Sequence, residues 1–202
     1  MRSTRPRGAH RAGPRSGAVI LELAGSIAVG YLFWGFLEYA VHGLLSHRWK
    51  TFASPLHWNH HQNPRFVFTS PIAVVPTTLL LFAIGTLVAS PLLAGAFVAG
   101  TLAGFCHYEW RHWRFHFREP RSARERLLRS HHLAHHFCNP RVYHGVTTRF
   151  WDRVFGTLPP GWREDYARVA DRAPIPGASN FSEVWNPRTT FAHYRRVTRG
   201  GR

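Results

Sequence analysis

The stretch PIAVVPTTLLLFAIGTLVASPLLAGAFVAGTLAGFC, residues 71–106, contains no charged side chain. Pro91 interrupts it near the middle, because proline lacks the backbone donor that a helix interior needs. The stretch therefore predicts a helical hairpin over roughly 71–89 and 91–109. A second apolar stretch, GAVILELAGSIAVGYLFWGFLEY at 17–39, is long enough to cross a hydrocarbon layer of about 30 Å. We expect an all-α integral-membrane protein with two or three spans.

The rest of the chain is polar and rich in arginine. The mean hydropathy of −0.23 does not reveal this contrast, because it averages the apolar and polar segments. The length of 202 residues predicts a single domain. We place a basic N-terminal tail at 1–16, a membrane-embedded domain at 17–160 and a basic C-terminal tail at 161–202. The last segment is rich in Arg, Pro, Asn and Gly, so we expect it to form a loosely ordered cover.

The formal net charge is +16, and 21 of the 26 basic residues lie at or after Arg48. The positive-inside rule predicts that this side is cytoplasmic, most simply at a bacterial inner membrane. Five arginines in residues 1–16 oppose that orientation, so either the larger excess dominates or the first segment is re-entrant around Gly25. Cys106 and Cys138 offer no disulfide framework and fit a reducing compartment. We expect the arginines to meet anionic headgroups or an acidic electron-donor protein rather than nucleic acid.

Ten histidines fall into four clusters, each at the end of an apolar stretch or just after one. In sequence order the clusters are HGLLSH (His42, His47), HWNHH (His57, His60, His61), HWRFH (His112, His116) and HLAHH (His132, His135, His136). Residues three and four apart share a helix face, so the imidazoles within the last three clusters should project together. His42 and His47 are five apart, which an α-helix would splay by about 140° unless Gly43 loosens it. Neutral imidazole is a common metal ligand, and ten of them predict two metals in a histidine-rich cap.

A purely imidazole set suits iron, although zinc and copper bind imidazole too, and zinc can replace iron in purified protein. A hydrolytic zinc site is disfavoured because no H-E-x-x-H motif is present. A zinc storage or sensor protein stays open as an alternative. We expect Glu38 and Glu109 to accept imidazole N–H groups and orient the rings, with a surface carboxylate as the alternative for Glu38. Asp152 is expected to bind backbone donors at a turn or cap.

The clusters and their flanking residues resemble the fatty acid hydroxylase/sterol desaturase superfamily of integral-membrane di-iron enzymes. The resemblance is carried by EYAVHGLLSH, LHWNHH, GFCHYEWRHWRFH, SHHLAHHF and YHGVTTRFWDRVFGT, between about Glu38 and Thr157. The last motif is most similar to the fatty acid 2-hydroxylase branch. One departure is Phe117, where the family usually has a second histidine after His116. His107, His131 and His144 are expected to be non-ligand histidines, and His10 and His193 lie outside the matching region.

The resemblance implies an O2-dependent hydroxylase that uses two irons to oxidise a lipid acyl chain, here near its carboxyl end. It implies no catalytic side chain beyond the metal ligands. With no cytochrome b5 domain in this chain, electrons are expected from a separate ferredoxin- or cytochrome b5-like donor. Five aromatic residues are expected to line an acyl channel: Trp34, Phe36, Trp58, Trp113 and Phe115. The alternatives are a sterol or carotenoid hydroxylase or desaturase, and a non-catalytic metal-binding membrane protein.

Overall fold

The computed structural model describes residues 14–49, 51 and 53–176, and these residues form helices and loops without a strand. In chain order the elements are α1 (Pro14–Tyr39), the π-helix η1 (Ala40–Arg48), α2 (Ala53–Gln62), α3 (Pro71–Val88), α4 (Pro91–Phe117), α5 (Ala123–Phe137), α6 (Phe150–Val154) and α7 (Trp162–Val169). The predicted all-α class is confirmed.

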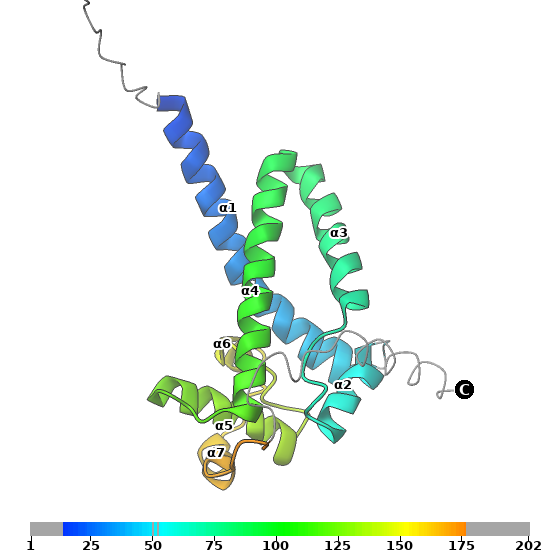
Figure 1. Ribbon diagram of the computed structural model, residues 1–202, viewed down its shortest axis with the longest axis vertical. Helices are drawn as coiled ribbons and strands as arrows, with labels where there is room; N and C mark the ends of the chain where they lie inside the picture. Colours follow the sequence, from blue (N-terminus) through cyan, green and yellow to red (C-terminus); the bar gives the residue numbers. More distant parts are fainter. Residues whose placement is uncertain (1–13, 50, 52, 177–202) are drawn as a thin grey trace, which may run out of the picture.

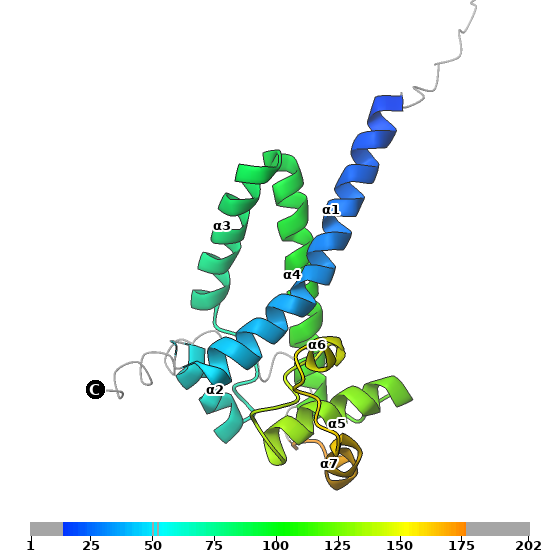
Figure 2. The same ribbon diagram turned by 180° about the vertical axis from the view of Figure 1, so that it is seen from behind.

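Three helices, α1, α3 and α4, stand side by side as an apolar stalk (Figures 1 and 2). The continuous helix Ser16–Arg48 and α4 are long and apolar enough to cross a membrane, and α3 is a shorter apolar helix. The predicted hairpin is present as α3 and α4, with Ser90 capping α4 just before Pro91. However, α4 runs on to Phe117 instead of ending near residue 109. A re-entrant first segment is wrong, because α1 passes through Gly25 as one unbroken helix.

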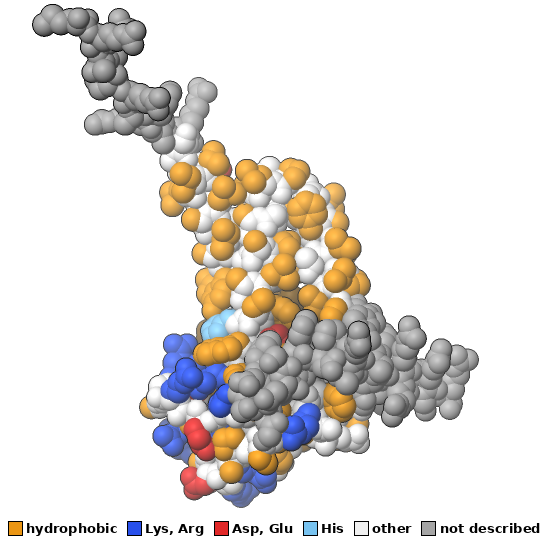
Figure 3. All heavy atoms as spheres, in the orientation of Figure 1, with side chains coloured by type: hydrophobic (Ala, Val, Ile, Leu, Met, Phe, Trp, Pro, Cys, Tyr) orange, Lys and Arg blue, Asp and Glu red, His pale blue; other side chains and the backbone are white. Residues whose placement is uncertain are grey.

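Helices α1 and α4 pack closely because small residues lie where they cross. A Cβ on Gly100 would overlap the backbone carbonyl of Ile27, so only glycine allows this approach. Nearby, the Ser26 hydroxyl donates to the carbonyl oxygen of Leu93 at 2.8 Å. The outward faces of the stalk are apolar: Leu32 is 72% exposed and Val88 is 84% exposed. Figure 3 shows this apolar surface over the stalk, and a patch of that extent fits lipid rather than water.

The segment η1 continues α1 with a wider turn, in which hydrogen bonds join residues five apart. The Trp49 amide closes it by donating to the Leu44 carbonyl at 2.8 Å. This wider turn brings the rings of His42 and His47 to 5.3 Å from each other, although an α-helix would splay residues five apart. The sequence predicts a local irregularity at Gly43, and the structure shows a π-helix that extends over all of Ala40–Arg48.

Helices α2, α5, α6 and α7 gather at one end of the stalk and form the cap, far from the N-terminal end of α1 (Figures 1 and 2). Helix α5 is held against α4 by the buried pair of Arg114 Nε and Glu125 Oε1, 2.5 Å apart. Helix α7 packs on α5 through Tyr166 and Val169. The sequence predicts a loose cover here, yet residues 162–169 form a helix whose apolar face is buried. On the face shown in Figure 3, arginine side chains lie on the cap rather than on the stalk.

Candidate metal centre

The structure brings the ten clustered histidines into two groups of five, and in each group one ligand atom per ring lies within 4.8 Å of the others. We call them the η1 group and the α4 group, after the helix that contributes to only one of them. The η1 group is His42, His47, His57, His61 and His135, and the α4 group is His60, His112, His116, His132 and His136. The predicted convergence of four clusters is confirmed, with a division between two groups that the spacing alone does not show.

Helices α2 and α5 each serve both groups. Helix α2 gives His57 and His61, four apart, to the η1 group and turns His60 toward the α4 group. Helix α5 does the reverse, because His132 and His136 face the α4 group while His135 faces the η1 group. Adjacent helical positions differ by about 100°, so each H-x-x-H-H motif reaches two neighbouring sites at once.

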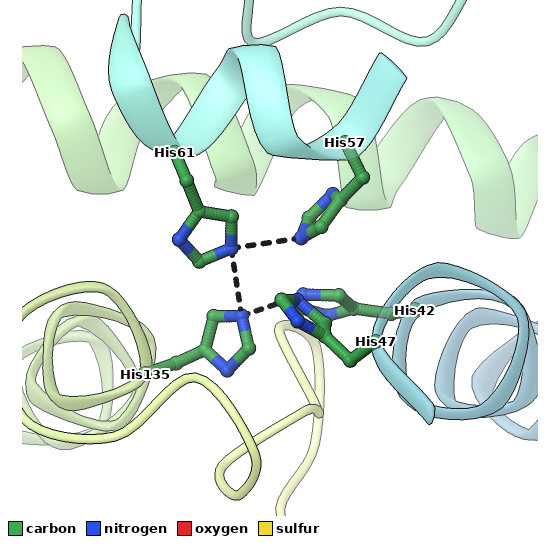
Figure 4. A group of neighbouring side chains, drawn as sticks. All are labelled: His42, His47, His57, His61 and His135. Atoms are coloured by element: carbon green, nitrogen blue, oxygen red, sulfur yellow. Dashed lines mark hydrogen bonds between the residues drawn. The ribbon is translucent and has the colours of Figure 1, made fainter. Parts of the chain in front are cut away.

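The Nε2 atoms point inward in both groups. In the η1 group, His135 Nε2 lies 3.0 Å from His42 Nε2 and 3.1 Å from His61 Nε2 (Figure 4). In the α4 group, His116 Nε2 and His132 Nε2 are 2.8 Å apart. Nitrogen lone pairs aimed at a common point are the arrangement that a bound cation needs.

Backbone carbonyls hold the outer nitrogens of two rings. His42 Nδ1–H donates to the His144 carbonyl at 2.5 Å, and His135 Nδ1–H donates to the Val142 carbonyl at 2.8 Å. In a neutral imidazole this leaves Nε2 without a proton and free to bind a metal. The loop between α5 and α6 therefore orients two of the five rings of the η1 group.

Buried ring nitrogens without a hydrogen-bond partner also indicate that the two groups bind metal. Among the described residues, Nε2 of His47 and Nε2 of His112 are buried and have no hydrogen-bond partner. A buried polar nitrogen without a partner is costly, whereas a metal ligand is satisfied by its ion. Each group contains at least one such Nε2 atom, so both groups fit a cation held by imidazole.

Burial keeps the histidines of the cap helices neutral. Desolvation, followed by the positive charge that neighbouring rings would carry, lowers the pKa of several group members well below the ordinary value: His57, His60, His132, His135 and His136. Burial lowers the pKa of His61 to about 4. Neutral imidazole is the form that binds metal, so at neutral pH these rings are ready to do so.

Among the described residues, Glu38 and Glu109 accept no imidazole N–H group, which corrects the roles predicted for them. Glu38 Oε1 accepts the backbone amides of Val146 and Thr147 at 2.5 and 3.0 Å, and Oε2 accepts the Thr147 hydroxyl at 2.6 Å. Glu109 Oε1 accepts the Thr69 amide at 3.1 Å and its hydroxyl at 2.5 Å. Both carboxylates satisfy loop donors that lie far away in sequence. Each thereby anchors a loop that borders one of the two groups.

Asp152 binds backbone donors, as predicted, and is fully buried. Its oxygens accept the amides of His144 and Gly145, each at 2.8 Å, and Nε2–H of His131 at 3.0 Å. Burial alone would raise the pKa of Asp152, but the hydrogen bonds outweigh it and hold the pKa below its ordinary value. His131 also contacts the Tyr166 hydroxyl through Nδ1. Sequence reasoning missed the contacts of His131 with Asp152 and Tyr166. Together with the backbone donors, they hold the part of the loop at His144 and Gly145, where the carbonyl that orients His42 lies.

The other histidines lie outside both groups. His107 Nδ1 lies 2.6 Å from the Tyr31 hydroxyl, at the α1–α4 interface. His131 faces Asp152, and His144 lies beside the η1 group, with its ring 5.7 Å from that of His47. His10 and His193 fall outside the described residues.

The five aromatic residues expected to line an acyl channel do not meet. Trp58 is 53% exposed, whereas Trp113 and Phe115 are buried in two different core clusters. Trp34 packs on Phe105 and Tyr108, and Phe36 packs on Trp151.

A pocket of about 540 Å³ instead borders the η1 group at His47. The residues that line it are Tyr39, Gly43, Leu44, His47, Arg48, Arg141, His144, Phe155 and Thr157. Sequence reasoning missed it because its walls come from η1 and from the loops around α6. The one signal in the sequence was the position of Arg48, directly after a predicted ligand.

The model of the fatty acid hydroxylase family matches residues 27–157. A dihydroceramide fatty acyl 2-hydroxylase of Arabidopsis thaliana is 36% identical, over 66% of this chain and 60% of that protein. A fatty acid 2-hydroxylase of Mus musculus is 30% identical, over 67% of this chain and 40% of that protein. The chain thus spans less than two thirds of the length of these curated relatives.

The fold of a solved relative agrees. A structure of full-length Scs7p in which only the hydroxylase domain is visible aligns with a TM-score of 0.61 and 26% identity. The alignment covers 80% of this chain and 66% of that one. Residues 27–157, which the family model matches, contain all ten histidines of the two groups. The chain belongs to the fatty acid hydroxylase family.

Proposed function

We propose that this protein is a membrane-bound di-iron hydroxylase that inserts one oxygen atom from O2 into a lipid acyl chain near its carboxyl end. The observation that carries the proposal is the pair of five-imidazole groups at the end of an apolar stalk. The names of the relatives, fatty acid and fatty acyl 2-hydroxylases, support the type of reaction and its position.

The ten histidines of the two groups would hold two irons, which supply O2 activation when bound. The chain itself orients the ligands, through the carbonyls of His144 and Val142 and through the anchors at Glu38 and Glu109. Burial in the cap keeps bulk water away from most of these rings. The cavity beside His47 would admit the substrate, which favours catalysis over metal storage.

We further propose that the cap faces the cytoplasm, in a bacterial inner membrane, and receives electrons from a separate ferredoxin- or cytochrome b5-like protein. The concentration of arginine on the cap supports this side and suits an acidic donor (Figure 3). The stalk would place the metals near headgroup depth, where the first methylenes of an acyl chain lie.

The test is to incubate membranes containing the protein with a reductant, isotopically labelled O2 and acyl lipids. We expect a product heavier by one labelled oxygen, with the hydroxyl on the carbon next to the carboxyl carbon. Membranes containing the His135→Ala variant serve as the matched control. Oxygen near the methyl end of the chain, or only on a ring lipid, would contradict the proposal.

A further inference from the structure

The pocket beside the η1 group has a chemical character that indicates its ligand. Arg48 and Arg141 line it, and both residues are exposed. Among the described residues, no carboxylate lies within ion-pair distance of either guanidinium. Two positive groups without partners at one pocket favour a negatively charged ligand.

A buried imidazole adds a hydrogen-bonding group to the same pocket. His144 is only 4% exposed, and both of its ring nitrogens are buried without a partner among the described residues. Its ring stacks on His47, and its Nδ1 lies so close to Gly43 that a Cβ there would come within 2.7 Å. A buried ring that makes no internal hydrogen bond is available to one polar atom of a ligand.

The remaining wall is apolar and continues toward the stalk. Leu44, Tyr39 and Phe155 line this side, and the ring of Phe155 stacks on Tyr39 at 5.0 Å. Phe155 is 51% exposed, and Phe150 and Val154 on α6 are each 53% exposed. Helix α6 packs on α1 where that span ends, so this apolar surface lies beside the lipid-facing stalk (Figure 2).

We propose that this pocket binds the free carboxylate of a long-chain fatty acid, with the carboxylate on Arg48 and Arg141 and a hydrogen bond from His144. The inference rests on the proposed function and specifies its substrate class. The methylene next to the carboxylate would lie beside His47, and the rest of the chain would leave along Phe155 toward the membrane. An acyl chain in amide linkage, as the name of the Arabidopsis thaliana relative implies for its substrate, carries no charge for the two arginines.

The experiment measures binding to zinc-loaded full-length protein in lipid nanodiscs, so that turnover plays no part. The probes are palmitate, methyl palmitate, N-palmitoyl dihydrosphingosine and a long-chain alkyl phosphate. The variants are Arg48→Gln, Arg141→Gln, the double variant and His144→Phe. Arg163→Gln, which changes an exposed arginine on α7, is the matched control. Zinc content and thermal unfolding of each variant establish that both metal groups are still formed.

We expect palmitate to bind about tenfold more weakly to each arginine variant, and more weakly still to the double variant, because a charged hydrogen bond is lost. Methyl palmitate should bind weakly to every protein, and Arg163→Gln should match the wild type. Equal binding of palmitate to the wild type and the double variant would overturn the inference. If N-palmitoyl dihydrosphingosine or the alkyl phosphate bound more tightly than palmitate, the inference would also be overturned.

The two proposals can fail separately. Arginine-dependent palmitate binding without oxygen insertion by iron-loaded protein would leave the pocket assignment standing and refute the hydroxylase. Oxygen insertion into a ceramide, with no arginine-dependent binding of palmitate, would support the hydroxylase and refute the pocket assignment.

Discussion

The η1 group and the α4 group contain the same number of imidazoles but are built differently. Three of the five η1-group histidines are only partly buried, and His47 borders the ligand pocket. Four of the five α4-group histidines are buried, and each of them lies on a regular α-helix. The η1 group therefore lies next to the pocket and, under the proposed function, would meet the substrate, whereas the α4 group lies deeper in the cap.

The two groups also depend on different supports. The α4 group draws its rings from α2, α4 and α5, each held by regular helical hydrogen bonds. The η1 group needs a π-helix and two carbonyls from the loop between α5 and α6. We therefore expect changes outside the ligands to disturb the η1 group first.

The largest expected effect separates the two groups by metal content. His135→Ala and His132→Ala should each remove one ligand from one group and leave the other group intact. Each variant should retain about one metal per chain instead of two. Loss of an outer hydrogen-bond partner of a metal ligand lowers activity roughly 10–100-fold, and loss of the ligand itself should lower hydroxylation further. Elemental analysis and product mass spectrometry check this.

The control is His193→Ala, which lies outside every cluster and should leave activity and metal content unchanged. If that variant were as inactive as His135→Ala while both proteins fold, the ligand set would be wrong.

The second prediction compares the two carboxylate anchors. Glu38→Ala should leave the amides of Val146 and Thr147 without their acceptor, at a cost of about 1–3 kcal/mol each in unfolding free energy. Because that loop orients His42, metal in the η1 group should also bind more weakly. Glu109→Ala removes the acceptor of the Thr69 amide instead and should weaken metal binding in the α4 group.

Thermal unfolding and competition with a metal chelator measure the two effects. Equal loss of both metals in the Glu38→Ala variant would contradict the separate anchoring of the groups.

How much the sequence predicts differs between the stalk and the cap. The uncharged run at 71–106 was sufficient to predict the hairpin, because turn chemistry and span length are local properties. The H-x-x-H-H spacing likewise predicted rings that project from one side of α2 and α5. Assigning His60 and His61 to different groups requires knowing where the neighbouring helices lie, which no single spacing contains.

The missed features depend on contacts between distant segments. Glu38 was expected near His42 because they are one turn apart, but its partners lie at Val146 and Thr147, in another part of the chain. The pocket joins Arg48 to Arg141 in the same way. The complete π-helix was only partly foreseen, since the histidine spacing indicated irregularity without specifying its form.

The third prediction tests the close approach at Gly43. Gly43→Ala places a Cβ within 2.7 Å of His144 Nδ1, so His144 must shift together with the carbonyl that holds His42. We expect several-fold weaker metal binding in the η1 group and an unchanged α4 group. Gly25→Ala is the matched control, because a Cβ there meets nothing within 4 Å. Identical metal titrations for the two variants would refute the steric argument.

The smallest expected effect is a pH dependence of the metal-free protein. Burial lowers the pKa of His61 to about 4, against about 6.5 in the unfolded chain. Between these values the unfolded state binds more protons, so stability is full above about pH 6.5 and falls as the pH drops toward 4. His132 and His135 contribute in the same direction.

The melting temperature of metal-free protein should therefore decrease from pH 7.5 to pH 5.5, and the His61→Phe variant should show a shallower decrease. A melting temperature that rises on acidification would contradict the neutral state of these rings.

Because α2 and α5 each supply rings to both groups, the two ions share one mechanical frame. The first ion to bind would fix the rotation of both helices about their axes and so pre-arrange the rings that the second ion needs. The entropy cost of ordering the two helices is met when the first ion binds. The second ion should therefore bind with higher affinity, so the two sites are coupled. A variant that has lost one ion should then still hold the other, although less tightly than the wild type does, and the distance between the ions would follow from the helix geometry of the two motifs rather than from any bridging side chain.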